Sequence, residues 1–321
     1  LGVLSAVQAV MTTRTSQGAV AWAITLITWP FVAVPAYWIL GRSKFNGYVR
    51  LRRDRTSDVL ENLDDVRREI EPHAVDLGAR FGEARVLEQL ARTRFTGNND
   101  TRLLVNGKAT FEAIFAGIEA ATEYVLVEFF IINDDSLGRE LKDRLAAKAA
   151  SGVAVYLLYD DVGSSRITNV YLKEVREAGV ETTGMKTTRG WRNRFQINFR
   201  NHRKIVVVDG RVAFIGGHNV GDEYLGKHPK LSPWRDTHMS ISGPAVLAVQ
   251  LAFVEDWYWA TETIPEVSWV SRPSEEGERM VFVLPSGPAD EYETCGLFFT
   301  HAINSARERI WIATPYFVPD E

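Results

Sequence analysis

Residues 19–40 stand out along the chain because the run AVAWAITLITWPFVAVPAYWIL contains no charged side chain. About 20 apolar residues in a helix cross the hydrocarbon core of a bilayer, which is roughly 30 Å thick. Pro30 and Pro35 would interrupt a helix in water, but membrane helices tolerate proline. The pattern therefore predicts one transmembrane helix over residues 19–40.

The charges that flank this run predict its orientation. Only Arg14 lies close before it, whereas a basic cluster follows it: Arg42, Lys44, Arg50, Arg52, Arg53 and Arg55. Because cytoplasmic flanks of membrane helices are rich in Lys and Arg, we expect the chain after Leu40 to be cytoplasmic. Residues 1–10 are interpreted as the end of an earlier membrane helix. We expect residues 1–40 to anchor the protein in the cell (inner) membrane, as a single-pass or multi-pass region.

Residues 41–95 are rich in charge and follow a helical pattern. Val59, Leu63, Val66 and Ile70 recur at helical spacing, and acidic and basic residues occupy the positions between them. This section is predicted to be a helical linker with a solvated face.

From residue 96 the pattern changes to alternating strands and helices. Helices are predicted over residues 111–121, 137–151 and 168–178, and strands over 124–132 and 153–159. The run YVLVEFFII at 124–132 is almost continuously apolar, as is typical of a strand buried on both faces. The fold class is therefore α/β, with a parallel or mixed sheet flanked by helices, and a first domain over residues 96–290.

A weak internal repeat links residues 120–135 with residues 305–320, at a shift of 185 positions. Each copy reads as a helix end, a charged turn, an apolar strand and an acidic loop. We interpret residues 291–321 as the start of a second α/β domain that is cut off.

Composition excludes several kinds of site. The 321 residues contain one cysteine, Cys295, so neither an internal disulfide nor a cysteine-based zinc site is expected. The net charge of -4 argues against a dedicated nucleic-acid binder, which is normally strongly basic. His202, His218, His228 and His238 match no common metal-ligand spacing, so no metal is expected.

The segment NHRKIVVVDGRVAFIGGHNVGDEY, residues 201–224, carries the candidate chemistry. Strands are predicted over 205–208 and 212–215, joined by a turn at Asp209-Gly210. His202 and Lys204 are one residue apart, so in an extended chain they share a face. An ammonium group offsets charge on phosphate oxygens, and an imidazole can attack phosphorus or move a proton. The pair therefore suits a phosphodiester.

Three residues after the second strand extend this site. Gly216 and Gly217 are expected to let a ligand approach the backbone, and Asn219 offers a neutral amide donor. Asp209, in the turn, is expected to have a structural role.

In order, these residues give H-x-K-x4-D-x6-G-G-x-N, which resembles the HKD signature of the phospholipase D superfamily. The resemblance extends to bacterial cardiolipin synthases through WRDTH at 234–238, ISGP at 241–244 and IATPYFVPDE at 312–321. Gln250, Phe253, Asp256 and Trp257 continue it. It covers essentially the whole chain, but only half of the family's length.

The resemblance implies a membrane phosphatidyltransferase that makes cardiolipin and glycerol from two phosphatidylglycerol molecules, with no cofactor. The catalytic motif residues are then His202, Lys204 and Asp209, and the substrate phosphate lies against Lys204 and Asn219. His202 is either the nucleophile that forms a phosphohistidine or the general acid and base. The implied partners are anionic phospholipid and the membrane, and no nucleic acid is expected.

The family has two HKD motifs, whereas this chain contains one. A second motif 185 positions after His202 would lie beyond Glu321. We therefore expect the second half of the site from a missing C-terminal part or from another chain, and the sequence by itself to be incomplete for activity.

Further side chains are candidates for a supporting role around these residues: Glu128, Gly217, Asp222, Glu223 and His238. Glu128 either orients an active-site group or pairs with a core Arg or Lys. Arg189, Arg192, Arg194 and Arg200 alternate with aromatic residues, which fits a lipid-headgroup patch, a single-strand nucleic-acid surface or a solvated loop.

Three alternative functions remain open from the sequence. A phospholipase D-type hydrolase would use water as the acceptor, and a nuclease would use the same motif on nucleic acid. A membrane scaffold would keep the fold without catalysis, although His202, Lys204 and Asn219 are all present.

Overall fold

The structure is a computed structural model that describes residues 1–13, 16–41, 57–78, 84–91, 93–185, 200–275, 277–287, 290 and 294–314. The chain forms two compact units. One unit comprises residues 1–54, 187–199 and 286–321, and the other comprises residues 55–186 and 200–285.

The first unit contains three apolar helices: α1 (Gly2–Thr12), α2 (Ser16–Thr28) and α3 (Pro30–Leu40). They pack around a small cluster that includes Ala9, Leu26 and Tyr37. The residues predicted to form an earlier membrane helix thus form α1.

The prediction of one continuous helix over residues 19–40 is wrong, because the run divides into α2 and α3 at Trp29-Pro30. Proline has no backbone N–H to donate, so Pro30 cannot continue α2, and it occupies the first position of α3, where its fixed φ is favourable. Among the residues that the structure describes, no helix is both long and apolar enough to cross a membrane.

The first unit also contains α11 (Thr294–Ser305). In the second unit, α7 (Asn106–Ala120) ends 185 positions before α11 does, which matches the shift of the internal repeat. The strand predicted after α11 is not formed, since residues 306–314 have no regular structure and Trp311 is 85% exposed. A strand needs a neighbour for its backbone hydrogen bonds, and none pairs with this run among the described residues.

The second unit is built on an eight-stranded mixed sheet with the order β4-β3-β2-β5-β6-β7-β1-β8. The β2, β3 and β4 strands are parallel, and the other neighbours are antiparallel. The bounds are β1 (Thr96–Val105), β2 (Tyr124–Phe129), β3 (Ala154–Asp160), β4 (Glu181–Met185), β5 (Lys204–Val208), β6 (Val212–Gly216), β7 (Thr237–Ser242) and β8 (Arg279–Val281).

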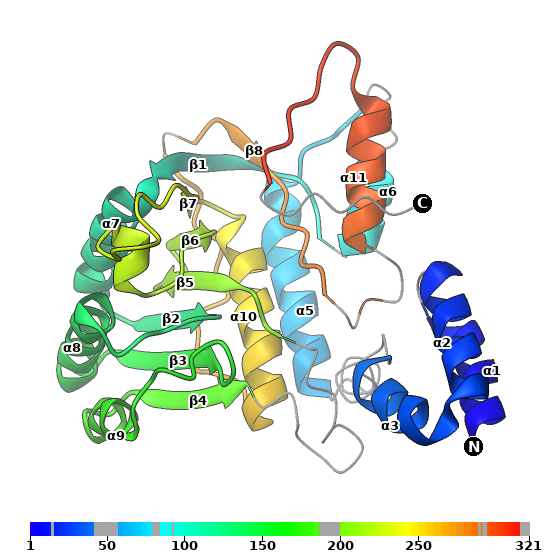
Figure 1. The fold of residues 1–321 in the computed structure, drawn as a ribbon. Helices are drawn as coiled ribbons and strands as arrows, with labels where there is room; N and C mark the ends of the chain where they lie inside the picture. Colours follow the sequence, from blue (N-terminus) through cyan, green and yellow to red (C-terminus); the bar gives the residue numbers. More distant parts are fainter. Residues whose placement is uncertain are drawn as a thin grey trace. The chain divides into compact units, whose positions relative to one another are not determined.

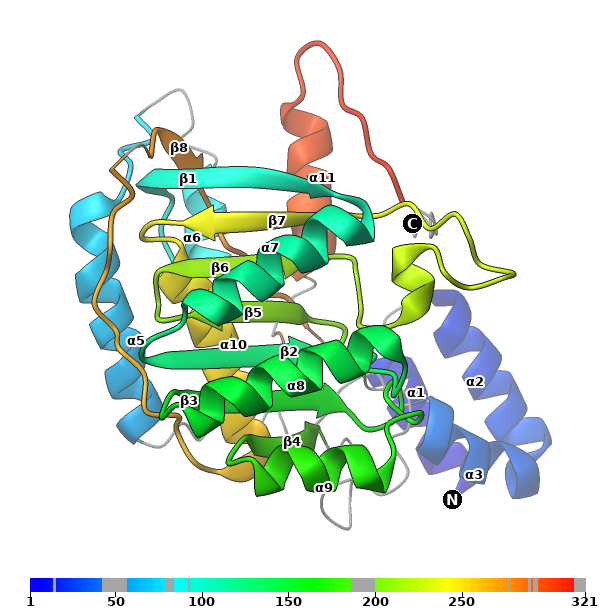
Figure 2. The ribbon, with the colours of Figure 1, turned by 90° about the vertical axis from the view of Figure 1, so that its left-hand side faces the viewer.

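Helices cover both faces of the sheet (Figures 1 and 2). One face carries α7, α8 (Ser136–Ala150) and α9 (Asn169–Glu177), and the opposite face carries α10 (Val246–Thr261). The main core lies under α7, α8 and α9 and includes Ile114, Leu141 and Val206. The predicted mixed α/β sheet with flanking helices is confirmed.

The charged section before the sheet contributes α5 (Ser57–Ile70), followed by short helices η1 (Glu71–His73) and α6 (Arg85–Ala91). Val66 and Ile70 of α5 are buried against Leu247, Ala248 and Leu251 of α10. The helix predicted from the spacing of its apolar residues is therefore formed, and it packs on α10 within the second unit. Because α10 lies between the sheet and α5, it is apolar around most of its circumference.

Candidate active site

The candidate residues meet at one end of the sheet because of the strand directions. The β5 strand runs antiparallel to β2 and β6, so the start of β5 lies beside the ends of both. Lys204 pairs with Phe129, and Gly216 pairs with His238 at the start of β7. His202 lies in the loop directly before β5.

His202 and Lys204 both contact the ring of Phe130, which follows β2. The His202 ring stacks on Phe130 with 4.0 Å between centroids and 17° between planes. The Nζ atom of Lys204 lies 5.4 Å from the Phe130 centroid, a cation–π distance. Lys204 Nζ also donates a hydrogen bond to the His202 carbonyl. The two groups thus lie on the same side of the strand, as the spacing predicted.

The environment alters the protonation of both groups. Partial burial and the Lys204 charge lower the pKa of His202, against an opposing effect of Asp160. Burial lowers the pKa of Lys204 to about 8, although Asp236 and Glu128 oppose this. At neutral pH the site therefore holds a neutral imidazole, which has a free electron pair, beside a Lys204 that is still mostly an ammonium.

Gly216 and Gly217 make room for side chains of this chain. A Cβ at Gly217 would lie 2.1 Å from Oδ1 of Asp236, and a Cβ at Gly216 would lie 2.5 Å from Cα of His238. Residues of β7 and the residue before it therefore take up the space where a side chain at either glycine would lie. The expected approach of a ligand to the backbone of these glycines stays a prediction.

Asp236 is a site residue that sequence reasoning passed over. Its carboxylate lies against Gly217, and its charge raises the pKa of Lys204. It also accepts a hydrogen bond from the Thr237 backbone N–H at 2.8 Å. Asp236 lies immediately before β7, and His202 lies two residues before β5. This shared place at the start of a strand is the signal that could have found Asp236.

His238, one of the candidates for a supporting role, lies in the core against Gly216. It is 1% exposed, and its ring centroid lies 5.7 Å from that of His218, which is fully buried. Burial, with His218 and Lys204 nearby, lowers the pKa of His238 to about 3. His238 is therefore a neutral core side chain at physiological pH.

Asn219 joins the end of β6 to the loop after β2. Its Oδ1 accepts from the Ile131 backbone N–H at 3.0 Å, and its Nδ2 donates to the Tyr224 hydroxyl at 2.9 Å. The amide group thus has a positioning role within the chain. Its phosphate-binding role stays a prediction.

Asp209 lies at the opposite end of β5 from His202 and Lys204, a position that agrees with the structural role expected of it. Its carboxylate accepts hydrogen bonds of 2.8 Å from the backbone N–H groups of Thr122, Glu123 and Tyr124. Burial raises the pKa of Asp209, but these hydrogen bonds outweigh burial and hold the pKa below its usual value. Asp209 therefore fastens the β5–β6 hairpin to the start of β2.

Asp222 and Glu223 hold the loop that precedes α8. The Asp222 carboxylate accepts from the hydroxyl and backbone N–H of Ser136 and from Leu137 N–H. The Glu223 carboxylate accepts from Asn133 Nδ2 at 3.0 Å. Both carboxylates are therefore occupied in positioning the start of α8.

Glu128 is buried on β2 and contacts the residue before His202. Its exposed fraction is 2%, and its Oε1 accepts a hydrogen bond from Asn201 Nδ2. Of the two interpretations of Glu128, this contact favours the one in which it orients an active-site group.

Two other predictions concern places away from this cluster. The described residues contain no group of three or more His, Cys, Asp or Glu side chains that could hold a metal ion. The predicted basic and aromatic patch cannot be placed, because residues 189–199 lie outside the described residues; of its arginines only Arg200 is described.

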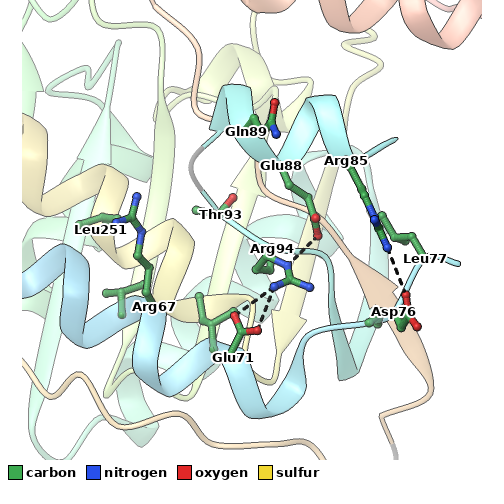
Figure 3. A pocket seen from close by; sticks show the side chains of 13 residues that line it. Arg67, Glu71, Asp76, Leu77, Arg85, Glu88, Gln89, Thr93, Arg94 and Leu251 are labelled. Carbon is green, nitrogen blue, oxygen red and sulfur yellow. Dashed lines mark hydrogen bonds and ion pairs between the residues drawn. The ribbon is translucent and has the colours of Figure 1, made fainter. Parts of the chain in front are cut away.

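A separate cavity of about 610 Å³ lies between α5, η1 and α6 (Figure 3). Its floor includes Val66, Ile70 and Leu251. Arg94 pairs there with Glu71 at 2.9 Å and with Glu88 at 3.1 Å. None of the candidate site residues lines this cavity.

Known proteins match both the domain and the whole chain. A family profile described as "Cardiolipin synthase, PLD-like domain" matches residues 114–229, which include His202, Lys204 and Asn219. The phospholipase D-like domain is thus the class to which the sheet and this site belong.

Two relatives define the family more narrowly. Cardiolipin synthase A of Pseudomonas fluorescens is 48% identical over 324 residues, and that of Pseudomonas putida is 49% identical over 324 residues. Each alignment covers 100% of this chain and 67% of the relative, so the chain spans about two thirds of their length. The chain belongs to the cardiolipin synthase family. Among solved structures, NucT from Helicobacter pylori is 14% identical, with a TM-score of 0.40 over 50% of this chain and 98% of NucT.

Proposed function

We propose that this chain carries one half of the active site of a phosphatidyltransferase that makes cardiolipin from two phosphatidylglycerol molecules and releases glycerol. The observation that carries this proposal is the pairing of His202 with Lys204 on Phe130 in a member of the cardiolipin synthase family. A neutral imidazole and an ammonium at one point suit an anionic phosphodiester.

The reaction proceeds in two displacements at phosphorus. In the first, an imidazole nitrogen attacks the phosphorus of phosphatidylglycerol, and the bond from phosphorus to the glycerol oxygen breaks. Glycerol leaves with a proton from the general acid, and a phosphohistidine remains. In the second, the hydroxyl of another phosphatidylglycerol attacks, the phosphorus–nitrogen bond breaks, and the general base takes the hydroxyl proton.

The residues described above have distinct tasks in this scheme. His202 is one of the two histidines, either the nucleophile or the acid and base. Lys204 offsets the negative charge on the non-bridging phosphate oxygens, and Asn219 donates to one of them. The second histidine comes from a second HKD half, in the same protein or in another chain.

We further propose that the protein works at the cytoplasmic face of the cell membrane, where its anionic phospholipid substrate lies. The first unit supports this location because its helices expose large apolar side chains to the surroundings, an arrangement that suits lipid contact. These include Leu4 at 73%, Met11 at 78%, Trp29 at 72% and Phe31 at 95% exposure. Alkaline extraction of cell membranes tests the location, since an anchored protein stays in the membrane pellet.

The activity test uses the complete protein in membranes supplied with labelled phosphatidylglycerol and no added metal. Cardiolipin together with glycerol supports the proposal. Phosphatidic acid without cardiolipin would identify a hydrolase, in which water replaces the acceptor lipid. Absence of any lipid turnover would reject both and direct the search to nucleic-acid substrates or a scaffold role.

A further inference from the structure

The carboxylate of Asp160 lies next to the segments that carry His202 and Phe130. Asp160 is the last residue of β3 and is 1% exposed. The β2 strand pairs with β3 in the parallel sense and with β5 in the antiparallel sense, so the ends of β2 and β3 lie beside the start of β5. The Asp160 side chain is therefore buried at the end of the sheet where the candidate site lies.

One oxygen of this carboxylate holds the residue that precedes His202. The Oδ2 atom of Asp160 accepts a hydrogen bond of 3.1 Å from the backbone N–H of Asn201. The Asp160 charge also acts on the neighbouring imidazole. Burial and the Lys204 charge lower the pKa of His202, whereas the Asp160 charge raises it. Asp160 therefore fixes the main chain beside His202 and lies close enough to influence its ring.

The other oxygen holds the turn that packs against Phe130. The Oδ1 atom of the same carboxylate accepts hydrogen bonds from the backbone N–H groups of Val162 at 3.0 Å and Gly163 at 2.8 Å. A Cβ at Gly163 would lie 2.2 Å from the Phe130 carbonyl oxygen and 2.7 Å from Cε2 of its ring. The Ser164 hydroxyl donates to the same carbonyl at 3.1 Å. This turn therefore lies directly against the ring on which His202 stacks.

The bond to Asn201 distinguishes Asp160 from an aspartate that only closes its own turn. An aspartate in a turn commonly accepts from the backbone N–H two residues further on, and one oxygen is enough for that. The second oxygen of Asp160 binds a residue 41 positions along the chain. Because all three donors are backbone N–H groups, the carboxylate ties together two stretches of main chain. The His202 ring and the Phe130 ring, 4.0 Å apart, each lie beside one of these stretches.

We propose that Asp160 is a positioning residue for the proposed reaction, whose carboxylate holds the His202 ring on Phe130 by binding both the main chain before His202 and the turn that packs on Phe130. This inference deepens the proposed function and rests on it for its kinetic consequences. Asp160 acts through His202 and not on the substrate. It keeps the imidazole in the orientation from which it reacts at phosphorus or transfers a proton.

The first test is Asp160→Asn in the complete protein. Asparagine has one acceptor oxygen and one NH2 group, so it cannot accept from both stretches of main chain, and its NH2 group faces an N–H donor. We expect kcat for cardiolipin formation to fall by roughly tenfold to a hundredfold, with KM within about twofold, because a misplaced catalytic group weakens the transition state more than substrate binding. Asp143→Asn, whose side chain is 74% exposed on α8, is the matched control and should keep the wild-type rate.

The second variant, Gly163→Ala, disturbs the same stack from the other side and changes no charge. The added methyl group displaces Phe130, so the same direction of change in kcat is expected. Gly97→Ala is its control, because a Cβ there would lie 3.5 Å from Val75, an ordinary contact. This variant also keeps the inference testable if Asp160→Asn does not fold.

A further measurement reads the position of His202 without turnover. Diethyl pyrocarbonate modifies exposed neutral imidazoles, and mass spectrometry quantifies the modification at His202. We expect faster labelling in Asp160→Asn and in Gly163→Ala, because the ring leaves Phe130, and wild-type labelling in both controls. Asp160→Asn also removes the charge that raises the pKa of His202, while Lys204 and Arg200, which lower it, remain. Labelling of Asp160→Asn should therefore persist to lower pH than labelling of Gly163→Ala.

The outcomes separate the two proposals. A wild type that makes no cardiolipin would reject the proposed function, while the labelling rates would still test the role of Asp160. A folded Asp160→Asn protein with a lower thermal unfolding midpoint, but with wild-type kcat and wild-type labelling of His202, would show that Asp160 only stabilises the fold and would overturn the inference. If Asp160→Asn does not fold, wild-type labelling of His202 in Gly163→Ala overturns it.

Discussion

At the scale of single residues, His202 is the side chain on which the chemistry depends most directly. It is exposed at the surface, with one ring face on Phe130, so removing it disturbs little packing. We predict that His202→Ala abolishes cardiolipin formation in the complete protein and leaves the thermal unfolding midpoint nearly unchanged. His228→Ala, in the loop after the motif, is the control. An active His202→Ala protein would contradict the site assignment.

Lys204 determines the alkaline side of the pH profile. Its pKa is lowered to about 8, so the charge that faces the phosphate is lost as the pH rises through that value. Arginine keeps its charge throughout this range. We therefore predict that Lys204→Arg, although less active because its shape differs, keeps its activity to higher pH than the wild type. Initial rates of cardiolipin formation are measured for both proteins at pH values between about 6 and 10. If the rates of the wild type and of Lys204→Arg fall at the same alkaline pH, the prediction is wrong.

His238 affects the stability of the fold toward acid. Its pKa in the folded protein is about 3, below the ordinary value of 6.5, so the unfolded chain binds a proton that the folded chain does not. The free energy of unfolding should then fall as the pH decreases from about 6.5 toward 3, with a contribution of up to about 1.4 kcal/mol per pH unit. His238→Phe should show a shallower dependence in denaturant unfolding at several pH values. An unchanged slope would mean that His238 is protonated in the folded state.

At the scale of elements, the β5–β6 hairpin positions the motif because it is attached at both ends. Asp209 and Gly210 both have positive φ, which suits a tight hairpin turn, and the Asp209 carboxylate binds the start of β2. At the opposite end of the hairpin, Asn219 holds the loop after β2. The site therefore depends on two attachments of one hairpin to one neighbouring strand.

This arrangement predicts that Asp209 contributes to stability and not to chemistry. Asp209→Ala leaves the backbone N–H groups of Thr122, Glu123 and Tyr124 without their acceptor, and the last of these is buried. The loss should lower the free energy of unfolding by about 1–3 kcal/mol. Because the pKa of Asp209 is lowered, its contribution is present at neutral pH and lost as the pH falls through its carboxyl range. The value of kcat per folded molecule should change little. Denaturant unfolding measures the change in stability, and the rate per folded molecule measures the change in kcat. A large loss of kcat in folded Asp209→Ala would show that Asp209 takes part in catalysis.

At the scale of the whole molecule, the second unit presents His202, Lys204, Asp236 and Asn219 at one end of a single sheet. The sheet brings together strand ends that are far apart along the chain, since β2 and β7 each contribute to this end beside β5 and β6. The proposed reaction places the phosphodiester of a phospholipid at this end of the sheet. The apolar helices of the first unit agree with a substrate that lies in a membrane.

The sequence by itself determined the elements whose patterns are local. The apolar run at 124–132 predicted β2, and the Asp209-Gly210 turn between two apolar runs predicted the hairpin. The spacing of His202 and Lys204 placed them on one side of the strand because side chains alternate along it. Where local rules competed, prediction was poorer: Pro30 interrupts a run whose hydrophobicity favoured a single helix.

Only the tertiary structure decided which distant residues meet. Asp256, in a largely apolar helix, reaches Asn201 and Arg203 because α10 packs against β5. Asp209 lies away from Lys204 because the two residues are at opposite ends of β5. Asp236 and His238 pack against the motif glycines because β7 pairs with β6. The physical reason is the same in each case. Periodicity predicts which side chains of a segment lie on the same face. The pairing of strands and the packing of helices determine which side chains of other segments contact that face.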